Sequence, residues 1–256
     1  MTAAIESQGL VRRFGNVEAV CGVDLRVEPG TFYGFLGPNG AGKSTTIKML
    51  TGLLAPTAGT VRVLGHDMLD MDDSLLAKAQ IGVVPENLAL FDNLTAREYL
   101  TFIGRMHQMP METIKSRTEE LLGLLDLANE RKKLTMEYSH GMKKKIALSA
   151  ALLANPKLLF LDEPFEGVDA VTSHTIRDLL LGFVARGSTV YLTSHVLEIV
   201  EKLCTHVGIV VKGKLVDQSP MSDIRAAGSL ETHFLKCTGA DILDTKKLSW
   251  LEGGAA

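Results

Sequence analysis

The fold is decided by residues 37–45, which read Gly37-Pro38-Asn39-Gly40-Ala41-Gly42-Lys43-Ser44-Thr45. This stretch fits the pattern GxxxxGK[ST], and its flanks supply the context that the pattern needs. Residues 31–36 before it form an apolar run of strand length, and residues 43–53 after it carry apolar side chains at helical spacing. A strand, a glycine-rich turn and a helix in this order predict a phosphate-binding loop in an α/β protein.

The residue types in this loop suit a polyphosphate bound together with a magnesium ion. Glycines let the backbone curl so that several N–H groups point at one phosphate, and the N-terminus of the following helix adds partial positive charge. We expect Lys43 to reach the β- and γ-phosphates and the Ser44 hydroxyl to bind Mg²⁺. All of residues 37–45 are therefore candidate nucleotide-binding residues.

A second candidate site lies where a buried strand is expected to end. Residues 158–161 form the apolar run Leu-Leu-Phe-Leu, and Asp162 and Glu163 follow it directly, before Pro164. Ligands in open α/β sheets bind at the carboxyl ends of the strands. We expect Asp162 to hold the Mg²⁺ shell and Glu163 to polarise the attacking water as a general base. Alone, two acids before a proline could simply begin a turn, but the phosphate loop favours the catalytic interpretation.

The rest of the pattern predicts one α/β domain over residues 1–256. Apolar runs at residues 81–84, 158–161 and 189–193 suit strands buried on both faces of a mainly parallel sheet. Residues 5–14 and 18–27 are expected to pair as antiparallel strands at the sheet margin. A helical subdomain is expected at about 87–155, and a short C-terminal extension at about 219–256.

Composition narrows the class of protein. The chain has 256 residues, of which 46% are hydrophobic and 22% charged, as in a packed globular protein. Its net charge of -3 does not favour nucleic-acid binding, and Cys21, Cys204 and Cys237 lack the spacing of a metal or disulfide framework. No secretory leader and no run of about 18 apolar residues is visible, so we expect a cytoplasmic protein that reaches a membrane only through a partner.

Further motifs, taken in chain order, resemble those of the nucleotide-binding subunits of ABC transporters. Residues 81–86 with 90–95 look like the Q-loop region, 138–143 like the LSGGQ-type signature, 166–169 like the D-loop and 193–195 like the switch histidine. Phe14 stands where that family has the aromatic side chain that stacks on adenine. The resemblance covers nearly the whole chain.

The resemblance implies the fold of an ABC-type P-loop NTPase, with a mainly parallel core sheet, an antiparallel β margin and a helical subdomain. It implies ATP and Mg²⁺ as cofactors and ATP hydrolysis as the activity. It also implies two partners, a separate transmembrane permease and a second nucleotide-binding subunit, and two intact half-sites in one chain favour a homodimer. The two copies would dock head to tail around two ATP molecules, at the inner face of the membrane.

Motifs and resemblance together define the candidate site. Catalysis is assigned to Glu163, His195 and Lys43, and metal binding to Ser44, Asp162 and Glu86. The nucleotide-binding candidates are Phe14, Gly37, Pro38, Asn39, Gly40, Ala41, Gly42, Lys43, Ser44, Thr45, Ser139, Gly141 and Asp169.

Three residues depart from the family pattern. His140 and Met142 replace a glycine and a glutamine of the signature, as in subunits of the drug- and polysaccharide-exporting branch. Ser139 and Gly141 are kept, so we expect contact with the nucleotide of the second copy. Glu86 replaces the Q-loop glutamine, and its carboxylate can still approach Mg²⁺ or a water bound to it.

Three functions from different classes stay open at this point. An exporter ATPase would dock its permease near residues 86–105, where Leu88, Leu90, Phe91 and Leu94 form either a docking groove or ordinary helical core. A soluble ABC-type ATPase acting on DNA or the ribosome is disfavoured by the single cassette. A non-hydrolysing sensor is disfavoured by the presence of Glu163 and His195. The basic run at residues 143–145 reads most simply as a solvated helix face, with contact to a partner or an anionic surface as the alternative.

Overall fold

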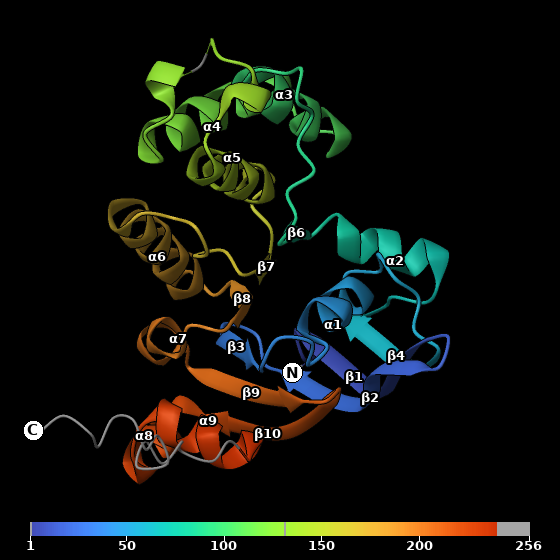
Figure 1. Ribbon diagram of the computed structural model, residues 1–256. Coiled ribbons are helices and arrows are strands. Elements are labelled where there is room, and N and C mark those ends of the chain that lie inside the picture. Colours follow the sequence, from blue (N-terminus) through green and yellow to red (C-terminus); the bar gives the residue numbers. More distant parts are fainter. Residues whose placement is uncertain (1, 131, 240–256) are drawn as a thin grey trace, which may run out of the picture.

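The larger of two β-sheets carries the phosphate loop. The computed structural model describes residues 2–130 and 132–239, and within these ranges one sheet has the strand order β10-β9-β3-β8-β7-β6 (Figure 1). Neighbouring strands from β9 to β6 are parallel, and β10 runs antiparallel to β9. The strands are β3 (Phe32–Leu36), β6 (Ile81–Val84), β7 (Leu158–Asp162), β8 (Thr189–Ser194), β9 (His206–Val211) and β10 (Lys214–Pro220). The predicted parallel sheet is confirmed.

The antiparallel strands form a sheet of their own beside the parallel sheet. Its order is β2-β1-β4-β5, with β1 (Ile5–Phe14), β2 (Val17–Val27), β4 (Ala58–Val63) and β5 (His66–Asp67). The predicted pairing of β1 with β2 is present, and β1 also pairs with β4 on its other edge. Because both edges of β1 are occupied, it cannot extend the parallel sheet. The two sheets meet where the Cys21 N–H donates to the Gly213 carbonyl at 2.8 Å.

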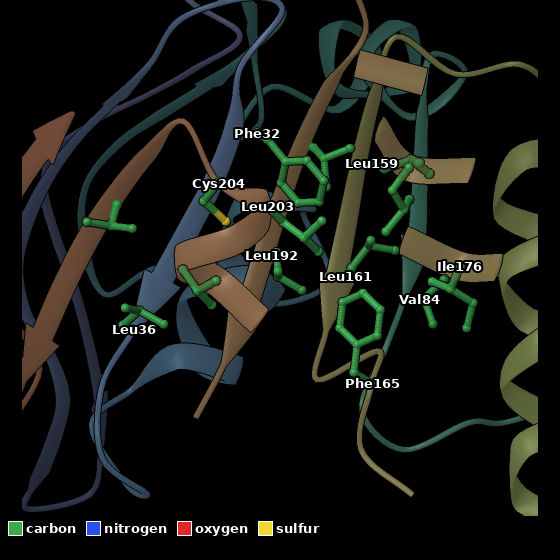
Figure 2. Close-up of a cluster of buried hydrophobic side chains, with 14 of the residues drawn as sticks. Phe32, Leu36, Val84, Leu159, Leu161, Phe165, Ile176, Leu192, Leu203 and Cys204 are labelled. Atoms are coloured by element: carbon green, nitrogen blue, oxygen red, sulfur yellow. The ribbon is translucent and has the colours of Figure 1, made fainter. Parts of the chain in front are cut away.

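Side chains of the central strands alternate between two hydrophobic clusters. Phe32, Leu159 and Leu161 point to one face, which is covered by α6 (Ala170–Ala185) and α7 (Leu197–Leu203) (Figure 2). Tyr33 and Phe160 point to the other face, toward α1 (Lys43–Leu50) and the antiparallel sheet. This alternation is the two-residue period of a strand, and burying one such side chain contributes about 1.5–3 kcal/mol.

Three helices form a group with its own apolar cluster, drawn at the top of Figure 1. They are α3 (Ala96–Met106), α4 (Met111–Leu124) and α5 (His140–Leu153). Helix α3 begins with a capping box, in which Thr95 and Glu98 each accept a backbone hydrogen bond from the other. Helix α5 belongs to both layers, because Ile146 faces this cluster whereas Ala147 and Leu148 face the core of the parallel sheet. It therefore links the helical group to the sheet.

Several short elements have no clear periodic signal in the sequence. They are α2 (Met71–Lys78), α8 (Met221–Ala227), α9 (Leu230–Thr238) and the 3-10 turns Ala128–Glu130 and Thr135–Glu137. Met221 and Leu230 join the sheet core, so the described part of the C-terminal extension packs against the domain. The remainder of that extension, residues 240–256, lies outside the described residues. Over the described ranges, every helix is too short or too polar to cross a membrane.

Candidate active site

The loop between β3 and α1 needs glycine at two of its pattern positions. Gly42 has φ 101°, and a Cβ there would lie 2.5 Å from the Ala19 carbonyl oxygen. A Cβ on Gly37 would lie 2.4 Å from the Val210 carbonyl oxygen. Any side chain at either position would collide with backbone, which explains the glycines of the motif. Because no side chain intervenes at these two positions, the loop can lie close to the strands. Its amides stay open to a ligand.

This loop forms one wall of a cavity of about 390 Å³, the size of a small-molecule site. Acidic and basic groups from distant segments complete the wall, and the mouth of the cavity opens at the carboxyl ends of the parallel strands. The lining residues are Ala19, Asn39, Gly40, Ala41, Gly42, Lys43, Ser44, Thr45, Glu86, Glu163, Glu166 and His195.

Lys43 curls back over its own loop. Its side chain is 8% exposed, and its Nζ donates to the Gly37 carbonyl at 2.8 Å and to the Pro38 carbonyl at 3.4 Å. The same Nζ lies 4.0 Å from a carboxylate oxygen of Glu163. Lys43 therefore lies between the phosphate loop and the acidic strand end.

Glu163 is held in an unusual backbone conformation at the end of β7. Its φ is 50°, in the left-handed region that residues other than glycine rarely adopt. Its N–H is 3.2 Å from both the carbonyl and the hydroxyl oxygen of Thr193 on β8. Its carboxylate accepts from the His195 N–H at 3.3 Å and lies 3.0 Å from His195 Nδ1. Strain of this kind is concentrated at functional sites, and here it aims the carboxylate into the cavity.

The three catalytic candidates, Lys43, Glu163 and His195, therefore meet at one cavity although they come from α1, β7 and the segment after β8. The metal candidates lie around them. Ser44 Oγ donates to Glu86 Oε2 at 3.3 Å, and both residues line the cavity. Asp162, the residue before Glu163, is buried and is not among the lining residues, and it accepts a hydrogen bond from the Thr193 hydroxyl.

These residues fit a magnesium nucleotide. Residues 39–45 of the phosphate loop line the cavity, and successive backbone N–H groups in such a loop can bind a phosphate group. Lys43 supplies positive charge to it. Oxygen donors of the kind that Mg²⁺ prefers come from Ser44, Glu86 and Asp162.

Six nucleotide-binding candidates are not among the lining residues. Gly37 and Pro38 belong to the phosphate loop itself, whereas the other four come from other segments. Phe14 is 47% exposed at the end of β1, with the Arg12 guanidinium 4.6 Å from its ring centroid. Ser139 caps the N-terminus of α5, where its Oγ accepts from the Met142 N–H, and Gly141 lies in the first turn of that helix. Asp169 caps α6, and the hydrogen bonds from the Thr172 N–H and hydroxyl lower the pKa of Asp169. One copy of the chain thus brings the phosphate loop and the catalytic candidates together but leaves these four outside.

Besides Ala19, which lines the cavity, two charged residues at the site are not assigned to it from the sequence. Glu166 lines the cavity. Lys144, expected with its neighbours on a solvated face, is instead 3% exposed, and its Nζ donates to the Glu163 carbonyl at 2.5 Å. That expectation is wrong for Lys144 because helical spacing places it on the same face as Ala147, Leu148 and Ala151, which faces the sheet core. This spacing is visible in the sequence, so helical periodicity could have found the residue.

Comparison with known proteins gives concordant matches. The family model described as ABC transporter matches residues 20–166. The daunorubicin resistance ATP-binding protein DrrA3 of Streptomyces coeruleorubidus is 36% identical over 223 residues, which cover 87% of this chain and 70% of that protein. The bacitracin transport ATP-binding protein BcrA of Bacillus licheniformis is 35% identical over 226 residues, covering 88% of this chain and 72% of that protein.

A solved structure entitled an ATP binding subunit of an ABC transporter superposes with a TM-score of 0.85. It is 27% identical to this chain and covers 92% of it and 99% of its own length. A dimeric ATP-binding cassette bound to ADP and Pi has a TM-score of 0.78 at 24% identity, which supports the same fold.

Proposed function

The chain belongs to the ABC transporter family, and from this membership we propose that it is the ATP-binding and ATP-hydrolysing subunit of a membrane exporter. Relatives named for drug resistance and for bacitracin transport support the export assignment. The observation that carries the catalytic part is the meeting of Lys43, Glu163 and His195 at one cavity beside the phosphate loop.

Each residue has a task that follows from its place. The loop amides and Lys43 would bind the β- and γ-phosphates, where positive charge stabilises the transition state of phosphoryl transfer. Glu163 would take a proton from the attacking water, and His195 would hold the Glu163 carboxylate in line through the contact at Nδ1. Mg²⁺, held by Ser44, Asp162 and Glu86, would neutralise charge on the phosphates.

We propose that a second copy of the chain completes the site. Ser139, Gly141 and Asp169 lie at the N-termini of α5 and α6, outside the cavity of their own chain. The first turn of a helix favours anions because its N–H groups are free and its dipole is positive there. In a head-to-tail homodimer the start of α5 would meet the γ-phosphate that Lys43 of the other copy binds. Phe14, exposed at the end of β1, would stack on adenine.

The permease would dock at a groove between the sheet and the helical group. A cavity of about 370 Å³ opens there, lined by apolar side chains of β6, α5 and the segment before α3. Leu88 and Leu90 line it, whereas Phe91 is exposed and packs edge-on against Phe102.

We propose accordingly that residues 1–256 act as one domain with a helical subdomain at about 87–155, bound to the cytoplasmic face of the membrane by the permease.

Co-purification tests this function. A tagged chain, recovered from gently solubilised membranes, is expected to bring down a multi-spanning membrane protein in stoichiometric amount. Leu53→Glu should weaken this recovery, since Leu53 lines the groove and is 68% exposed, whereas Val216→Glu at a 48% exposed site on β10 should not. Recovery only away from membranes, with ribosomes, DNA or nothing attached, would overturn transport and leave ATP hydrolysis standing.

A further inference from the structure

The first two turns of α5 contact the loop that follows β7 at two points. Lys144 Nζ donates to the Glu163 carbonyl at 2.5 Å. One helical turn earlier, the His140 ring packs on Gly167, where an added Cβ would lie 2.8 Å from His140 Cδ2. The helix that begins at the signature residues Ser139 and Gly141 is therefore in direct contact with the segment that carries the catalytic carboxylate.

The lysine contact completes the anchoring of the Glu163 backbone. The N–H of Glu163 is held by Thr193, and its carbonyl accepts from Lys144 Nζ at 2.5 Å and from the Glu166 N–H at a longer 3.3 Å. Because Glu163 is only 7% exposed and has a φ of 50°, its backbone is both buried and strained. A strained residue persists only where its surroundings fix it, and Lys144 gives the shorter of the two hydrogen bonds that the carbonyl accepts. Fixing the peptide on both sides of Cα sets the direction in which the carboxylate leaves the backbone.

The packing around Lys144 does not call for a lysine. Its neighbours on the same helix face, Ala147, Leu148 and Ala151, are apolar members of the sheet core. Burial lowers the pKa of Lys144, and the nearby carboxylates of Glu166, Glu163, Glu86 and Asp162 oppose that shift. A buried ammonium is unfavourable unless it is hydrogen-bonded and compensated by charge, and an apolar side chain would fill this position more simply. What the lysine adds is the hydrogen bond to Glu163.

We propose that Lys144 is a positioning residue for Glu163, holding its backbone so that the carboxylate meets His195 and the attacking water. The contact also links the catalytic carboxylate to the helix that reaches the nucleotide of the second copy. A shift of α5 on pairing would thus be felt at Glu163 of the same chain. This inference rests on the proposed ATP hydrolysis.

The experiment compares Lys144→Met, Lys144→Gln and Lys145→Met in the full chain, together with any membrane protein that co-purifies. Phosphate release gives kcat and KM, and nucleotide titration gives Kd. In Lys144→Met we expect kcat to fall about tenfold or more, with KM and Kd within about twofold, because only the transition-state arrangement is lost. Lys144→Gln can still donate a hydrogen bond, so its kcat should lie between those of the wild type and of Lys144→Met. Lys145→Met, at a partly exposed neighbour outside the signature residues 138–143, should match the wild type.

A double variant separates positioning from a general effect on the fold. In a Glu163→Gln background, adding Lys144→Met should leave the residual rate unchanged, because the group that Lys144 positions is already inactive. A further fall in that background, a Lys144→Gln variant as slow as Lys144→Met, or an unchanged kcat in Lys144→Met would each overturn the inference. An inactive wild type would instead overturn the proposed ATP hydrolysis itself.

Discussion

Around the cavity, Glu163 lies 4.0 Å from Lys43 and 3.0 Å from His195, whereas Ser139 and Asp169 use their side chains to cap their own helices. We call the first region the cavity face and the second, with Gly141, the signature face. The cavity face is assembled by core strands within one chain. The signature face is exposed and presents two helix N-termini outward. The difference supports the proposal that one chain holds half of two sites rather than one complete site.

The largest effect is expected from the cavity face. Glu163→Gln keeps the shape of the side chain but removes the general base, so kcat should fall by about 10²–10⁴. Nucleotide Kd should change little, because Lys43 and the loop are untouched. Glu166→Gln is the matched control, since Glu166 lines the same cavity without the contact to His195. Equal losses in the two variants, measured by phosphate release, would contradict the role given to Glu163.

A change on the signature face should stop turnover without loosening the fold. A side chain at Gly141 meets open space within one chain, so Gly141→Asp should leave the melting temperature nearly unchanged. Its carboxylate would face the γ-phosphate of the second copy, and we expect turnover to fall about 10²-fold. Gly123→Asp, at another helical glycine with open space, is the control. Nucleotide binding by the monomer should survive both changes, and its loss in Gly141→Asp would break the distinction between the faces.

A substitution at Glu86 tests whether this residue of the cavity face helps to bind Mg²⁺. Its carboxylate lies 3.3 Å from the Ser44 hydroxyl, where it can approach Mg²⁺ or a water bound to it. In Glu86→Gln we expect the Mg²⁺ concentration for half-maximal turnover to change by about tenfold, as when a supporting group of a metal site is replaced. An identical Mg²⁺ titration of the two proteins would leave Glu86 without a metal role.

The smallest effect is expected from Phe14. Loss of a stacked ring weakens binding by about 0.5–1.5 kcal/mol, so Phe14→Ala should raise the KM for ATP about fivefold and leave kcat unchanged. Val17→Ala, at a 66% exposed apolar residue in the same hairpin, should leave KM unchanged. If KM were unaffected in Phe14→Ala, the ring would serve only to pack against Arg12.

The sequence is most informative where the structure depends on residues that are close together in the chain. The phosphate loop is contiguous, and its glycines are explained by local contacts with Ala19 and Val210. The strands β3, β7 and β8 were predictable because full burial on both faces requires continuous apolar runs. Sequence order alone could also place Glu163 at a strand end.

The rest depends on contacts between distant segments. The separate antiparallel sheet arises because β1 pairs with β4, and β2, β3 and α1 lie between these two strands in the chain. The hydrogen bond of Lys144 depends on the loop after β7, and the outward position of Ser139 depends on how α5 packs on the sheet. Short helices such as α2 form with little apolar periodicity, and α2 begins where Asp70 caps the Asp73 N–H.

ATP-dependent pairing of the Glu163→Gln chain tests the split site most directly. Without the base, bound ATP persists, and molecular mass in solution can be compared with ATP and with ADP. We predict a dimer with ATP, a monomer with ADP, and a monomer in both when Gly141→Asp is added. A chain that stays monomeric with ATP, or that pairs regardless of nucleotide and of Gly141→Asp, would contradict the account.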